Sequence, residues 1–75
     1  MSQNIITIIG WHEGARTIDA TRAIREHCGV SLRAAKSAVE RCLDGEVAEL
    51  ACYDRKAANA LAAELTELGF EVRPG

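Results

Sequence analysis

The sequence predicts a small α+β domain in which three helices cover one face of a three-stranded sheet. Short segments rich in β-branched residues alternate with longer segments whose apolar residues recur at helical spacing. Glycines stand just beyond the predicted helices, where a left-handed residue ends a helix. A chain of 75 residues has room for one domain only. We therefore predict a single domain over residues 1–75 with the order β-α-α-β-α-β.

The first predicted element is a strand over residues 4–9, which contains four isoleucines. β-Branched side chains suit a pleated surface, and Gly10 ends the run. Residues 10–16 contain two glycines and no periodicity, so we expect a loop. Isoleucines fall on both sides of this strand, while helices cover only one face of the sheet. The open face is therefore predicted to support a homodimer.

A first helix is predicted over residues 18–28, with Thr17 as N-cap, Asp19 in the first turn and Gly29 just past the end. Its inner stripe is Ala20, Ile24 and His27 or Cys28. The neighbouring face carries Ile18, Thr21, Arg22 and Arg25.

A second helix begins after Ser31, another candidate N-cap, and ends at Asp44-Gly45. Its apolar stripe follows the i, i+3, i+4 rule and consists of Leu32, Ala35, Val39, Cys42 and Leu43.

The last third of the chain is predicted to form strand, helix and strand. Residues 46–52 alternate as a half-solvated strand, with Ala48, Leu50 and Cys52 on one side. Asp54 caps a third helix over residues 55–68, closed by Gly69. The inner stripe of this helix is Ala58, Leu61, Ala62, Leu65 and Leu68. Residues 70–73 alternate as a short final strand before Pro74.

Positive charge is concentrated in the first two helices. Six of the nine Lys and Arg residues lie between Arg16 and Arg41, so residues 1–41 carry about +2 and the remainder about −4. The whole chain has a net charge of −2 and a pI near 5.6, which argues against nucleic acid as a partner. Recognition of an acidic protein would have to be local, through one face of the domain.

The basic face that we expect to bind a protein combines charged and apolar residues: Ile18, Thr21, Arg22, Arg25, Arg33 and Lys36. Arginine outnumbers lysine among the basic residues here, and the guanidinium fork suits carboxylate recognition. The other interpretation is a solvated helix face that keeps the protein soluble, since Arg22 and Glu26 have the spacing of an i, i+4 ion pair. The sequence leaves both open.

A second candidate surface is the loop that contains Trp11, His12 and Glu13. An exposed tryptophan can anchor an interface, and a buried one would cover the edge of the core. His12 and Glu13 are consecutive, so they do not face one another, and no nucleophile is near in sequence. We therefore predict no enzymatic activity, no metal site and no cofactor. The alternative function is an accessory subunit or small-ligand regulator that uses this loop.

The three cysteines, Cys28, Cys42 and Cys52, have no CxxC spacing and are an odd number. They are predicted to be reduced, buried apolar residues. The apolar runs are short, and residues 1–4 lack the basic start of a signal peptide. A cytoplasmic protein without a membrane segment is the expectation.

Several segments resemble the C-terminal domain of the bacterial ribosomal stalk protein. The resemblance covers residues 17–43 and 55–73. It rests on Ile24-Arg25, Gly29, Val30-Ser31-Leu32-Arg33-Ala34-Ala35-Lys36, Val39-Glu40, Ala60-Leu61, Leu65 and Leu68-Gly69-Phe70-Glu71-Val72. It implies the predicted fold and a protein-binding role, because basic and apolar residues of the first two helices recruit acidic translational GTPases in that family.

The positions that are basic both here and in that family are Arg22, Arg25, Arg33 and Lys36, and Ile18 is an apolar neighbour. The chain has Thr17 at a basic position of the family, Thr21 at an apolar contact position and Ser31 at a turn glycine.

The adaptor that delivers N-degron substrates to the Clp protease shares this fold, and the segment from Gly45 to Tyr53 is similar to one of its strands. Cys42 stands at the position of that family's histidine, while Glu13 could supply one carboxylate for a free amino terminus. A peptide-binding role of this kind is a further alternative.

Overall fold

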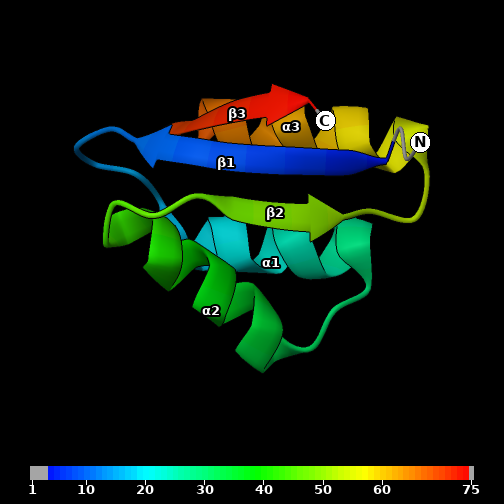
Figure 1. The fold of residues 1–75 in the computed structure, drawn as a ribbon, viewed down its shortest axis with the longest axis horizontal. Helices are drawn as coiled ribbons and strands as arrows, with labels where there is room; N and C mark the ends of the chain where they lie inside the picture. Colours follow the sequence, from blue (N-terminus) through cyan, green and yellow to red (C-terminus); the bar gives the residue numbers. More distant parts are fainter. Residues whose placement is uncertain (1–3, 75) are drawn as a thin grey trace.

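The computed structural model of the protein confirms the predicted fold class (Figure 1). It describes residues 4–74, so three of the four residues on which the signal-peptide prediction rests lie outside the described part of the chain. In chain order, the elements are β1 (Ile5–Trp11), α1 (Thr17–Cys28), α2 (Leu32–Leu43), β2 (Ala48–Ala51), α3 (Arg55–Glu67) and β3 (Phe70–Pro74).

The sheet is antiparallel, with β1 in the centre between β2 and β3. Ile6 lies opposite Leu50 on one side, and Ile8 lies opposite Val72 on the other. Strand β1 is longer than predicted, because the pairing resumes after an irregularity between Ile8 and Gly10 and continues to Trp11 opposite Phe70. The loop therefore begins at His12, two residues later than predicted, and Gly10 lies inside the strand.

All three helices lie on the same side of this sheet (Figure 1). Helix α3 lies against β1 and β3, helix α2 lies against β1 and β2, and α1 contacts both of these helices. The largest fully buried side chains are Phe70, Ile6, Ile8, Ile24, Leu61, Leu65 and Cys42. None of the buried side chains described is polar or charged, so the core depends on apolar packing alone.

Two of the three predicted helix N-caps are confirmed. The Ser31 hydroxyl accepts a hydrogen bond from the Ala34 amide at 3.1 Å, and the Asp54 carboxylate accepts one from the Ala57 amide at 2.7 Å. The predicted Thr17 cap is wrong, because Thr17 lies inside α1 and the N-cap is Arg16, whose side chain makes no capping bond. The helix start is instead favoured by Asp19 in its first turn.

Two leucines of the predicted stripe on α2 are not buried. Leu32 is 50% exposed and Leu43 is 36% exposed, whereas Ala38 takes a buried position that the prediction omitted. Leu32 and Leu43 are the first and last residues of α2, which runs obliquely to the sheet with its first turn farthest from the strands (Figure 1). The i, i+3, i+4 rule gives the direction of a side chain around the helix, but not whether its turn reaches the core.

The remaining predicted elements need smaller corrections. Strand β2 is shorter than predicted, although Ala48, Leu50 and Cys52 are buried as expected. Helix α3 ends one residue early, and β3 includes Pro74. Cys28 is only half-buried, while the other two cysteines are buried.

The core makes a prediction about stability. Leu61→Ala removes a side chain that is fully buried between α3 and the sheet, and we expect it to lower the free energy of unfolding by about 3 kcal/mol. Ile18→Ala is the matched control, because Ile18 is 78% exposed and its truncation should change stability by less than about 0.5 kcal/mol. Urea denaturation measures both, and equal losses would contradict the described core.

The open face of the sheet carries the homodimer prediction. Ile5 and Thr7 are half-buried there and Ile9 is 38% exposed, so some apolar surface faces solvent. We expect a dimer at concentrations on the order of tens of micromolar in analytical ultracentrifugation, and we expect Ile9→Lys to shift it towards monomer by placing a charge in the interface. A strictly monomeric mass for the unmodified protein would refute the prediction.

Candidate functional site in the groove between α1 and α2

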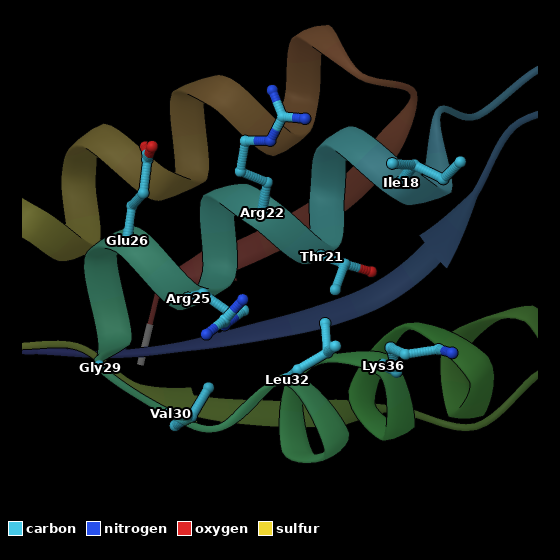
Figure 2. Close-up of a pocket in the computed structure, with 9 residues that line it drawn as sticks. All are labelled: Ile18, Thr21, Arg22, Arg25, Glu26, Gly29, Val30, Leu32 and Lys36. Carbon is cyan, nitrogen blue, oxygen red and sulfur yellow. The ribbon is translucent and has the colours of Figure 1, made fainter.

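A groove of about 730 Å³ separates the exposed faces of α1 and α2 (Figure 2). We call it the α1/α2 groove. Helix α1 contributes Ile18, Thr21, Arg22, Arg25 and Glu26. The turn and α2 contribute Gly29, Val30, Leu32 and Lys36. Five of the six residues predicted to bind a protein therefore line one concave surface.

The turn at Gly29 brings the two helices together. Gly29 has a φ of 64°, in the left-handed region that glycine adopts without steric cost, and its amide donates to the Arg25 carbonyl at 3.1 Å. Only three residues separate the end of α1 from the start of α2, and Ser31 caps the second helix at once. The chain therefore reverses abruptly, so that the two helices border a common groove.

Side chains from the two helices meet across the groove. Figure 2 shows Thr21 and Arg25 pointing from α1 toward the gap, where Val30 and Leu32 approach from the other side. Arg22 extends from the far rim of α1 in the same view. A partner seated in the groove would thus contact cationic groups on both sides of an apolar strip.

The cations of the groove have no carboxylate partner among residues 4–74. Arg22, Arg25 and Lys36 make no ion pair there, and the predicted pair of Arg22 with Glu26 is absent. With Glu26 as the one carboxylate of the lining, three positive groups and one negative group leave a charge of about +2. The charges therefore remain available to an external anion.

Arg16 and Arg41, the first and last basic residues of the segment 16–41, form ion pairs, unlike the arginines of the groove. Arg16 pairs with Asp19 at 3.3 Å, and Arg41 pairs with Glu46 at 3.8 Å. Intramolecular carboxylates thus partly neutralise the margins of the segment but not its centre. This distribution concentrates unpaired positive charge in the groove.

Apolar surface lies between the charges. Ile18 is 78% exposed and Leu32 is 50% exposed, and Val30 is half-buried beside them. Large apolar side chains with this exposure lose unfavourable hydration when a partner covers them. An apolar centre with charged residues around it is the usual composition of a protein-binding surface.

Arg33 is the predicted site residue that the groove does not include. It lies on a neighbouring shallow depression of α2, together with Ser37 and Glu40. Leu32 and Lys36 border both surfaces, so Arg33 is adjacent to the groove rather than part of it.

Trp11 is the last residue of β1 and not a loop residue as predicted, and with His12 and Glu13, which follow it, it marks a separate surface that we call the Trp11 loop. Trp11 is 44% exposed, and the His12 Nε2 lies 3.3 Å from the Glu71 Oε1. None of Trp11, His12 and Glu13 lines the α1/α2 groove. The two candidate surfaces predicted from the sequence are therefore distinct in the structure.

Among residues 4–74, one group of side chains could supply metal ligands. Oxygen or nitrogen atoms of Glu26, His27 and Glu64 lie within 4.8 Å of one another. The His27 Nε2 lies 3.3 Å from a Glu64 oxygen, which gives an ion pair between α1 and α3 when His27 is protonated. The side chain of Glu64 is 45% exposed, and helix–helix pairing accounts for the arrangement.

Four residues of the lining were not predicted from the sequence: Glu26, Gly29, Val30 and Leu32. Leu32 had been placed in the buried stripe because its spacing to Ala35 and Val39 is helical. Leu32 directly follows the N-cap and lies in the first turn of a helix that begins after a tight turn. This position could have indicated that its side chain lies at the edge of the core. Val30 had no signal beyond its place in the turn.

Comparison with known proteins gave no matching family model, no matching curated protein and no matching solved structure. Across residues 4–74, the helices are all too short and too polar to cross a membrane.

The Gly29 turn makes a testable prediction. A Cβ atom at Gly29 would overlap the ring of Tyr53, whereas one at Gly45 would meet no atom within 4 Å. Both glycines have positive φ, 64° and 90°, so alanine strains the backbone at either position. We expect Gly45→Ala to cost about 1 kcal/mol and Gly29→Ala about 2 kcal/mol in urea denaturation. Equal costs would show that Tyr53 does not constrain the turn.

Proposed function

We propose that this protein is a small non-enzymatic adaptor that docks an acidic partner protein in the α1/α2 groove. The partner would present carboxylates to Arg22, Arg25 and Lys36 and an apolar side chain to Ile18 and Leu32. In this proposal the protein acts in the cytoplasm.

The observation that carries the proposal is the combination of unpaired cations with exposed apolar side chains in one hollow. Arginines that serve only solubility have no need of a neighbouring isoleucine that is 78% exposed. Exposed apolar surface alone would accept many partners, and the surrounding positive charge selects against basic ones. The two features together favour an amphipathic acidic segment.

The resemblance to the ribosomal stalk C-terminal domain supports the same class of function, because it places protein recruitment on the corresponding helices. Nucleic acid fits less well: the net charge of the chain is −2, and no aromatic side chain lines the groove. The proposal therefore names an acidic protein rather than RNA or DNA.

Charge reversal in the groove tests the proposal. The probe is a fluorescent synthetic helix with leucine on one face and glutamate on the other, and binding is followed by anisotropy. We expect Arg22→Glu combined with Arg25→Glu to weaken binding by at least about tenfold, because two attractive charges become repulsive. Affinity of the unmodified protein should fall as salt rises from about 0.05 to 0.5 M, since salt screens exposed charges.

Arg73→Glu with Lys56→Glu is the matched control, since it makes the same change in charge on β3 and α3, outside the groove lining. Binding that fell equally in the control would reflect net charge only and would contradict docking in the groove. Loss of binding with Trp11→Ala but not with the groove variant would show that the partner binds at the Trp11 loop and not in the groove. Ile18→Ala separately tests the apolar contribution in a variant whose fold should be intact.

A further inference from the structure

Two cysteines that are distant in sequence lie in contact. The Sγ atoms of Cys28 and Cys52 are 3.2 Å apart, although 24 positions separate the residues. Cys28 is the last residue of α1, and Cys52 directly follows β2. Both are free thiols in this structure.

Backbone hydrogen bonds hold the two segments together at this point. The Tyr53 amide, next to Cys52, donates to the carbonyl of His27, next to Cys28, at 3.1 Å. The Cys52 amide donates to the Asn4 carbonyl at 2.8 Å. The ring of Tyr53 also lies against Gly29, the residue after Cys28. Because the main chain already fixes both positions, a bond between the sulfurs requires them to approach by roughly 1 Å.

We propose that Cys28 and Cys52 form an oxidisable dithiol, which low-molecular-weight disulfides convert into an intramolecular disulfide. This inference is independent of the function proposed for the groove. The bond would join the end of α1 to the end of β2 and would close a loop containing all of α2.

The reaction is a double thiol–disulfide exchange. Cys28, the more exposed of the pair, loses its proton to solvent and attacks one sulfur of the oxidant, which releases one small thiolate. Cys52 then loses its proton and attacks the Cys28 sulfur, which releases the second thiolate. The two thiolates take up the two protons, so the protein loses two protons and two electrons, equivalent to two hydrogen atoms, and the small disulfide gains them.

The environment of Cys28 makes this a slow reaction at neutral pH. Burial, with the hydrogen bond and charge of Cys52 adding to it, raises the pKa of Cys28 to about 12. Below that value the thiolate fraction, and hence the rate of the first step, should rise about tenfold for each unit of pH.

Oxidised glutathione is the probe for the experiment. After incubation of the native protein at mildly alkaline pH, we expect its intact mass to fall by two hydrogens, with Cys42 as the remaining free thiol. Peptide mapping should identify the Cys28–Cys52 bond. The melting temperature should rise by roughly 10 °C relative to the reduced form, because the bond constrains a 24-residue separation in the unfolded chain.

Cys42 provides the control, because it is buried in α2 and its sulfur lies 3.7 Å from the Ile8 carbonyl. Cys42→Ala should form the same bond and retain no free thiol, whereas Cys28→Ser should show no loss of two hydrogens. A bond that includes Cys42, a stable glutathione adduct in place of the internal bond, or three unreacted thiols in the unmodified protein would each overturn the proposal.

Discussion

The position of α1 in the helical layer is the constraint on which the rest of the structure depends. Helix α1 contacts both α2 and α3, and it buries Ala20, Ala23 and Ile24. The two alanines are small enough to allow close approach of neighbouring elements, and Ile24 fills the core. Since one side of the helix is fixed in this way, Arg22 and Arg25 have only the outer side available. The groove is thus a consequence of how the core is packed.

The elements with strong periodicity could be predicted from the sequence, whereas several of their ends were predicted wrongly. Leu61 and Leu65 on α3 show why the prediction works, since both follow helical spacing and both are fully buried. The N-cap at Thr17 was wrong because a capping side chain is only one way to start a helix, and α1 begins one residue earlier without it. The strand through Gly10 was missed because the pairing partner on β3 is set by tertiary structure.

The basic face could also be predicted, because charges on one side of an amphipathic helix follow directly from spacing. What spacing does not give is the relation between two helices. That relation decides that Lys36 faces the groove with Arg25, while Arg33 lies on the adjacent depression. The contact of Cys28 with Cys52 belongs to the same class of information, since it depends on where β2 ends relative to α1. Such features arise from packing between elements and leave no local pattern.

Amide chemical-shift mapping would show whether the α1/α2 groove is the docking surface for an acidic partner. The ¹⁵N-labelled protein would be titrated with the acidic amphipathic helix described above. We expect shifts concentrated at Ile18, Arg22, Arg25 and Lys36, with residues of β1 and β3 unchanged. Shifts concentrated on Trp11 or on the strands, with the amides of the groove unmoved, would contradict it.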